Sequence, residues 1–374
     1  MSGKYRTAYK QDMALVKTAP QRWVAGAVAL IAVAAPFIFE IDWTPPLGFP
    51  WATWFTAINL SLVAIVGAAA FNLLLGYTHQ VSVAHAAFLM LGTMTAAYFG
   101  SVMGLSVWVV IPISMVAGAV VGAIVGLPAL RFRGLYLLIA TFGVHFFAFL
   151  AFKKFNVRYF GFVPMRFDPP TIPSWLHWLP FVNPDDNGEF LIKGNFRFYW
   201  LLLIAASLSI LFMVNIIRSR EGRAFMAVAE HDVSAALIGI NVTKTKLLAF
   251  AVSSAFVSLT GVLGSYYVRA RGEDSFPFSV VLFYAIMIIV GGLGSMKGAV
   301  LGSLFFYMAP VFFDWARADF PIIKEIQFLQ DFQNETNLAI FGILIIVVLV
   351  LRPSGIAGIW TSIRDYAAKW PFSR

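Results

Sequence analysis

Long apolar runs, separated by short polar or glycine- and proline-containing segments, dominate the pattern along this chain. A helix of roughly 20 apolar residues crosses the ~30 Å hydrocarbon core of a membrane. Reading each run between its charged, Pro or Gly boundaries predicts about ten transmembrane helices. We expect them at residues 24–39, 54–75, 83–99, 108–130, 135–152, 198–217, 247–268, 276–292, 299–313 and 338–351. The pattern therefore predicts an all-α, polytopic integral membrane protein.

The third run, 83–99, is short and begins in a polar, glycine-containing stretch, so a partly re-entrant segment is the alternative to a full span. The charges favour a full span. If the N-terminal tail is cytoplasmic, an even number of spans before Arg218, Arg220 and Arg223 returns this basic cluster to the cytoplasm.

Composition supports a single membrane domain over residues 1–374. The chain is 60% hydrophobic and 12% charged, whereas soluble domains are about 45–50% apolar and about 25% charged. Its net charge of +9 comes from Lys and Arg in short loops beside apolar runs, a pattern typical of membrane topology and not of nucleic-acid binding. The absence of cysteine excludes disulfides, thiol catalysis and thiolate metal sites.

Lys and Arg are concentrated in the segments that this topology places in the cytoplasm. These are the N-tail 1–23, the loop 219–245 and the C-tail 352–374, whereas 153–197 and 314–336 are expected outside. We therefore expect a multi-pass protein of the bacterial inner membrane with both termini cytoplasmic.

The cytoplasmic loop contains an alanine-rich stretch, 223–237, that predicts a short amphipathic helix ending before Gly239. Its apolar positions are spaced for one helical face, while Glu230 and Asp232 stay polar. Such a helix could simply anchor the loop at the membrane interface. Alternatively, it is a coupling helix that docks on an ATPase subunit, with the contacts carried by Arg223, Glu230, Asp232 and Gly239.

Motifs for phosphate-binding loops, zinc proteases and serine hydrolases are absent, so ATP hydrolysis would have to come from another chain. A membrane enzyme lacks a set of His, Asp or Glu at membrane depth. The spans carry no charged residue, which disfavours an ion-coupled transporter.

Polar side chains at membrane depth are costly unless they face a cavity or a partner. We single out Gln80, Ser82 and His85 as candidates for a substrate pathway, followed by Tyr136 and Thr141. Hydrogen bonds between helices, or a core histidine, are the structural alternatives. Glycine-rich interruptions at 76–95 and 291–302 form a pair of the kind that marks substrate pathways in transporters built from two related halves.

Five segments resemble, in order along the chain, the branched-chain amino-acid ABC permeases of the LivM type. They are GYTHQVSVAHAAF at 76–88, LRFRGLYLLIATFG at 130–143, the cytoplasmic stretch EGRAFMAVAEHDVSAALIGINVTKTKLLAF at 221–250, GGLGSMKG at 291–298 and LRPSGI at 351–356. The family usually has Ala-Gly where this chain has Thr78 and His79, and often Gly where it has Ala84.

This resemblance implies the pore subunit of an ATP-driven importer. Its partners would be a sister permease, two ATP-binding subunits that hold ATP and Mg, and a periplasmic substrate-binding protein, in membrane lipid; no cofactor, metal or catalytic residue is expected in this chain. Whether the pore is a homodimer or a heterodimer stays open. The implied substrates are leucine, isoleucine or valine, with urea, short amides or aromatic acids as alternatives. A channel or facilitator that works without ATP is the alternative from another class.

Overall fold

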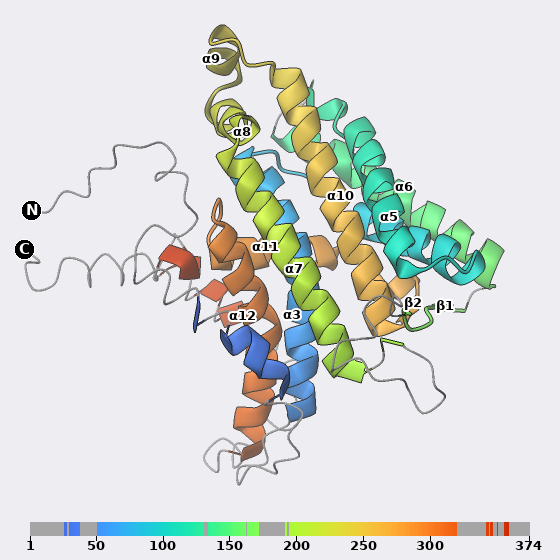
Figure 1. Cartoon of the computed structure of the whole chain (residues 1–374). Helices are drawn as coiled ribbons and strands as arrows, with labels where there is room; N and C mark the ends of the chain where they lie inside the picture. The colour runs from blue at the N-terminus through green and yellow to red at the C-terminus, as the bar shows by residue number, and fades with distance from the viewer. Residues whose placement is uncertain are drawn as a thin grey trace, which may run out of the picture.

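The computed structural model describes residues 26–27, 30–37, 51–130, 134–161, 163–171, 191–192, 194–319, 342–343, 345–346, 350 and 355–358. Within these ranges the chain is almost entirely helical (Figure 1). The elements are α3 (Trp51–Tyr77), α4 (His85–Thr95), the π-helix η1 (Ala96–Val102), α5 (Val107–Val125), the 3-10 helix η2 (Pro128–Leu130), α6 (Leu135–Phe160), β1 (Met165–Arg166), α7 (Gly194–Arg218), α8 (Arg220–Glu230), α9 (Asp232–Leu237), α10 (Val242–Val268), β2 (Ala270–Arg271), η4 (Glu273–Ser275), α11 (Ser279–Gly291) and α12 (Met296–Asp319).

Seven helices in the described ranges are long and apolar enough to cross a membrane. They are α3, α5, α6, α7, α10, α11 together with η4, and α12. The third expected span corresponds to the continuous helical stretch formed by α4 and η1. The expected spans at 24–39 and 338–351 fall largely outside the described residues. The all-α, polytopic membrane fold is therefore confirmed, and the count of ten stays a prediction.

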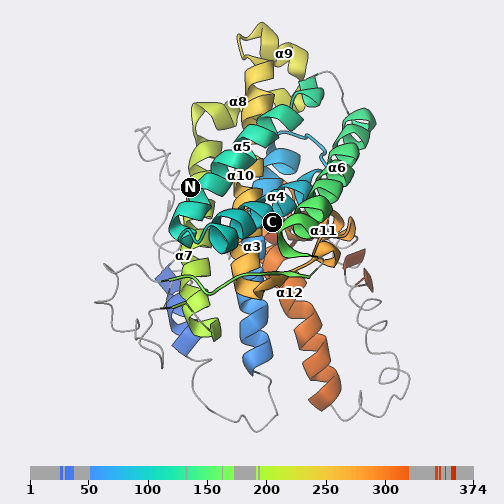
Figure 2. The same cartoon turned by 90° about the vertical axis from the view of Figure 1, so that its right-hand side faces the viewer.

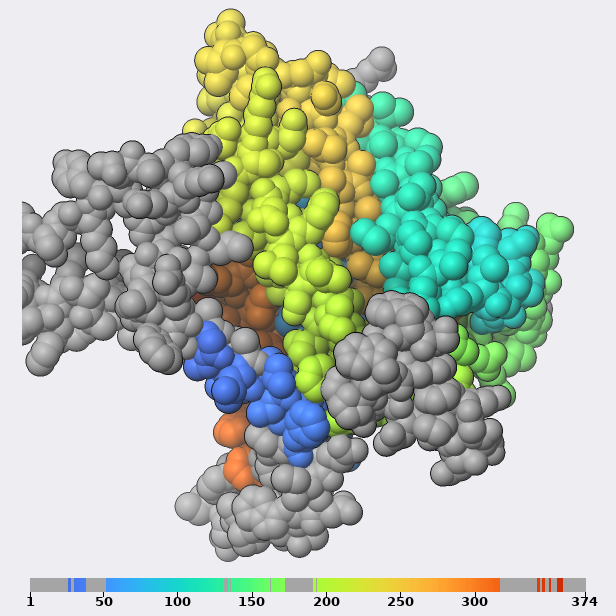
Figure 3. Space-filling model, in the orientation of Figure 1, coloured from blue at the N-terminus to red at the C-terminus, as the bar shows by residue number. Residues whose placement is uncertain are grey.

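Helices α3 and α10 form the centre of the bundle. In their most apolar windows, 83% of the residues of α3 and 78% of those of α10 are buried, against at most 39% in the other five candidate spans. Helix α10 packs against α3, α4 and α5, while α3 also contacts α7 and α12 (Figures 1 and 2). Helix α7 crosses the outer face in front of this pair (Figure 3). The outer helices expose apolar side chains, as lipid-facing helices do.

Small residues bring α5 and α10 into close contact. Gly118 and Gly122 lie one turn apart on α5 and face Ser254 and Ser258 of α10, so that a Cβ at either glycine would overlap α10. The hydroxyls of Ser114 and Ser258 share a hydrogen bond of 2.7 Å. Close backbone approach and interhelical hydrogen bonds drive helix association in lipid, where burying apolar side chains provides little. This seam fixes α5 against the centre of the bundle.

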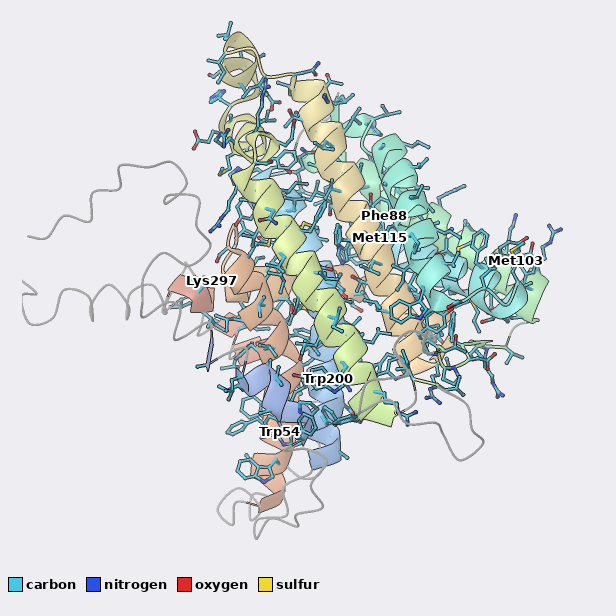
Figure 4. All side chains as sticks on the ribbon, in the orientation of Figure 1. Trp54, Phe88, Met103, Met115, Trp200 and Lys297 are labelled. Carbon is cyan, nitrogen blue, oxygen red and sulfur yellow. The ribbon has the colours of Figure 1, made fainter. Side chains whose placement is uncertain are left out.

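The two ends of the bundle carry different structures. At one end β1 pairs antiparallel with β2, with Met165 opposite Arg271, and Trp54 and Trp200 lie toward the same end (Figure 4). At the other end α8 and α9 lie beyond the end of α7, and α8 contacts α10 (Figure 1). The described part of the loop 219–245 therefore lies at the end of the bundle opposite to β1 and β2.

Two connecting segments, 153–197 and 314–336, are shorter than the apolar runs suggested. Helix α6 continues past residue 152 to Phe160, α7 already begins at Gly194, and α12 extends to Asp319. Charged residues at a helix end stop a hydropathy run but not the helix itself, because long side chains reach the interface from the last turns.

Candidate functional site

The polar segment between α3 and α4, residues 78–84, is folded into the bundle and is not helical. Gln80, Ser82 and His85 are all at most 5% exposed. Within the described residues, neither side-chain amide atom of Gln80 has a hydrogen-bond partner, and Nε2 of His85 also lacks one. Ser82 Oγ accepts a bond from the Ala84 amide at 3.3 Å. Most buried polar groups are paired, so two neighbouring unpaired side chains mark this segment as a candidate site.

His85 stands between two aromatic rings and beside a small cavity. Its ring centroid lies 4.8 Å from that of Phe71 on α3 and 4.3 Å from that of Tyr284 on α11. The cavity has a volume of about 10 Å³, which is room for about one water molecule. Its lining comes from α3, α4, α10 and the segment before α4, and consists of Phe71, Leu74, Ser82, His85, Phe88, Phe250, Ser253, Ser254 and Val257. The space is too small for an amino acid.

The two second-rank candidates, Thr141 and Tyr136, lie in different surroundings. Thr141 on α6 is 1% exposed, and its hydroxyl accepts a bond from the Val83 amide at 3.0 Å, which places it against the polar segment. Tyr136 is 71% exposed on the outer face of α6, away from the other candidates. Helix α6 is apolar on nearly every side, so hydropathy does not show which of its faces points inward.

The two glycine-rich interruptions meet at one end of α3. Asn72 is fully buried; its Nδ2 donates to the carbonyl of Ser295, and its Oδ1 accepts from the amide of Gly294, both at 3.0 Å. Gly76 lies directly against the backbone of Gly294. The sequence analysis missed Asn72, although an Asn within an apolar run, one turn before an interruption, is a signal of the same kind as Gln80.

The helix expected at 223–237 is in fact two helices. Helix α8 begins after Ser219, whose hydroxyl accepts a bond from the Gly222 amide, and it ends at Glu230. His231 then adopts an extended conformation and α9 begins. Phe225 and Val228 of α8 are buried as the spacing predicts.

Helix α9 instead exposes its apolar side chains. Val233 is 62% exposed, Leu237 84% and Ile238, just after the helix, 74%. We call these three residues the α9 tip. Figure 3 shows the yellow α8–α9 segment at the extreme end of the molecule, and the tip therefore projects beyond the membrane helices.

Of the four expected coupling residues, Arg223 and Glu230 are exposed on α8. Asp232 is tied to α10, because its Oδ2 lies 2.7 Å from Nζ of Lys246. Gly239 has a φ of +87°, a conformation that favours glycine, and it ends α9 as expected. Lys246 was not expected to contribute; only the fold brings it to Asp232.

His79 connects the polar segment to α8. Its Nδ1 donates to the carbonyl of Ala229 at 3.3 Å, and its backbone has a φ of +49°. Few residues other than glycine adopt this left-handed conformation. It accounts for the glycine that the family pattern has at this position.

The five sequence segments that carry the family resemblance converge on the segment 76–88. It contacts 130–143 through Val83 and Thr141, 221–250 through His79 and Ala229, and 291–298 through Gly76 and Gly294. Gly355 of the last segment lies against Gly292. Residues far apart in sequence thus form one contiguous region.

The profile of the family described as "Branched-chain amino acid transport system / permease component" matches residues 53–349. The chain belongs to this family. Over 354 residues, 91% of this chain and 75% of the relative, the permease is 25% identical to the high-affinity branched-chain amino acid transport system permease protein LivM of Salmonella typhimurium. It is 26% identical over 189 residues to LivH of the same organism, covering 50% of this chain and 55% of LivH. It is also 30% identical over 175 residues to BraD of Pseudomonas aeruginosa, covering 46% of this chain and 52% of BraD.

Proposed function

We propose that this permease is the pore subunit of an ATP-driven importer that moves branched-chain amino acids or a related small solute delivered by a periplasmic binding protein. It lies in the bacterial inner membrane, with both termini and the loop 219–245 in the cytoplasm. Two separate ATPase chains hold ATP and Mg, and this chain changes which side of the membrane has access to the pathway.

The exposed α9 tip is the observation that carries this proposal. An apolar surface at the end of a membrane bundle, beyond the spans, is the kind of surface that marks a protein–protein contact. If the loop were only an interfacial anchor, its apolar face would lie along the bundle with that of α8. The tip points away from the bundle instead, as docking on an ATPase requires.

Two contacts would carry movement of the docked loop into the membrane. The Asp232–Lys246 ion pair connects α9 to α10, which lines the cavity beside His85. The bond between His79 and Ala229 connects α8 to the polar segment on the other side of the same cavity. A shift of α8 and α9 would therefore act on both walls of the closed pathway and open it.

A sister permease is the expected second half of the pore. This chain resembles both LivM and LivH, each named as a permease protein of the same kind of transport system. Two related chains can form a pseudo-symmetric pair around one pathway. A homodimer would be the outcome if the chain forms a complete pore without a second permease gene product.

The proposal is tested by co-expressing the chain with its neighbouring genes and reconstituting the purified complex in liposomes. Leu237→Asp places a charge on the tip without disturbing the core, while Gly239→Pro is incompatible with a φ of +87°. Glu230→Arg reverses the charge next to the tip. Each variant should lose the ATPase subunits or ATP-dependent uptake.

Met103→Asp is the matched control, since Met103 is an exposed apolar residue at the opposite end of the bundle, 55% exposed. It should leave both ATPase association and uptake unchanged. If the tip variants retain ATP-driven uptake, or if the chain purifies alone and conducts solute without ATP, the channel alternative replaces the importer.

A further inference from the structure

Arg271 turns its guanidinium into the outer end of the bundle. It is the second residue of β2, directly after α10. Its Nη2 donates to the carbonyl of Gly264 at 3.2 Å, and its Cζ lies 5.7 Å from the ring centroid of Phe276. Val63 of α3 flanks the same glycine. The side chain thus lies between α3, α10 and Phe276, which precedes α11.

This cation has no carboxylate partner among the described residues. Glu273, two residues further on, pairs with Lys153 at 3.4 Å, and Asp274 is exposed. The Nε of Arg271 is a buried atom without an acceptor among the described residues. Burial lowers the pKa of Arg271, because desolvation disfavours the charged form. Arginine nevertheless stays protonated in proteins, so a half-buried positive charge remains that is only partly compensated within the described ranges.

The guanidinium stands at the outer end of a line of polar and aromatic groups along α3. Tyr284 packs against Gly67 of α3, one turn deeper than Val63, and its ring contacts His85. His85 in turn contacts Phe71, one further turn along α3. The line ends at the small cavity and the polar segment described above.

We infer that Arg271 binds the carboxylate of the solute at the outer end of the pathway. The fork of N–H donors on a guanidinium matches a carboxylate in geometry and charge. The ligand neutralises the half-buried cation, while Nε supplies the donor that has no acceptor in the described part of the chain. The inference rests on the proposed function and names its substrate class: a small carboxylic acid, such as an amino acid or an aromatic acid, and not urea or a neutral amide.

A purely structural role would also use the same contacts, since a cation near the last carbonyls of α10 stabilises the end of that helix. The two roles differ in what depends on the charge. A structural role depends on packing and on the bond to Gly264, whereas the subsite depends on a positive charge that faces the solute.

The absence of cysteine from the chain allows a direct test of this charge. Arg271→Cys is made in the reconstituted complex, with wild type treated in parallel to correct for cysteines of the partner chains. The Cys variant should raise the leucine concentration for half-maximal uptake about tenfold or more, as loss of a charge-assisted contact requires. A cationic methanethiosulfonate reagent should restore uptake, and a neutral reagent of the same size should not.

Arg269→Cys is the control, because Arg269 lies two residues before Arg271 and takes no part in the contacts described above; it should respond to neither reagent. Arg271→Lys checks folding, since it keeps the charge without the fork and should fall between wild type and the Cys variant. The subsite would be overturned if unmodified Arg271→Cys needed the same leucine concentration for half-maximal uptake as wild type. It would also be overturned if the cationic and neutral reagents restored uptake equally.

A second measurement separates this inference from the proposed function. Leucine and benzoate should raise the melting temperature of the purified wild-type complex more than leucinamide and benzamide do, and this difference should vanish in Arg271→Cys. The result does not depend on ATP-driven uptake. If acids and amides raise the melting temperature equally, the subsite is refuted even when ATP-driven transport is confirmed. If the acids stabilise the complex more than the amides do but no ATP-driven uptake is found, only the importer is refuted.

Discussion

Nζ of Lys246 lies 2.7 Å from Oδ2 of Asp232, and the two side chains are only 8% and 13% exposed. The pair joins the short helix α9 to the first turns of α10, the helix that packs against α3, α4 and α5. A displacement of α9 is therefore passed directly to the centre of the bundle.

Lys246→Met removes this connection and leaves the Asp232 carboxylate largely buried without its cation. Breaking a buried pair in this way costs about 3 kcal/mol, so the melting temperature should fall. Uptake should fall further than the loss of folded protein accounts for, because α9 is uncoupled from α10. The reversed pair, Asp232→Lys with Lys246→Asp, should recover part of the melting temperature and part of the uptake. If neither recovers, the pair does not act as a unit.

Gln80 and Asn72 should respond in opposite directions to apolar substitution. Gln80→Met removes a buried amide that has no partner, which should stabilise the fold by about 1 kcal/mol. Asn72→Leu removes two hydrogen bonds and should destabilise it by roughly 2 kcal/mol.

Under the proposed function the Gln80 amide contacts the solute, so uptake should nevertheless fall in Gln80→Met. Thermal unfolding and uptake of both variants are measured side by side. If Gln80→Met lowers stability and leaves uptake intact, Gln80 is a structural residue.

The glycine seam predicts a contrast between two Gly→Ala substitutions. In Gly122→Ala the new Cβ overlaps the hydroxyl of Ser254, and such overpacking costs about 1–3 kcal/mol. Gly143 lies within α6 with nothing within 4 Å of its Cβ position, so Gly143→Ala should gain up to about 1 kcal/mol from helix propensity. Melting temperatures of the purified variants test this, and a similar loss in both would show that packing against α10 is not responsible.

His79 combines a left-handed backbone conformation with a hydrogen bond to α8, so its substitution should affect the coupling of ATP hydrolysis to uptake. His79→Gly relieves a left-handed backbone that costs about 1–2 kcal/mol in other residues and removes the bond to Ala229, so stability should change little. Coupling should suffer: ATP hydrolysis should continue while uptake per ATP falls. Arg269→Gly relieves a similar conformation, a φ of +64°, at the opposite end, and it should keep the ratio of uptake to ATP hydrolysis of the wild type.

The described spans could be predicted from the sequence because hydrophobic length alone decides whether a helix crosses the membrane. The break at His231 could not. Residues 223–237 have helical spacing throughout, and the apolar positions of α9 are ones that a soluble helix would bury. In this chain Val233 and Leu237 are left exposed, and periodicity does not distinguish a face that packs within the chain from one that faces a partner.

The candidate site was predicted in part. Gln80, Ser82, His85 and Thr141 were found because polar residues stand out in apolar runs, and the fold brings them together. Tyr136 did not join them, since polarity carries no information about which face of α6 points inward. Lys246 and Asn72 were missed because their partners, Asp232 and Ser295, are identified only by tertiary contact.

The order in which the chain is made has a consequence for the central helix α3. Its Asn72 is satisfied by Ser295, 223 residues later in sequence, and its partners α10 and α12 follow most of the other spans. When α3 leaves the ribosome and enters the bilayer, it carries polar groups that no neighbour yet covers. Helices insert individually before they associate. Biogenesis of this permease therefore has to shelter α3, at the insertion machinery or against a temporary neighbour, until the second half of the protein has been synthesised.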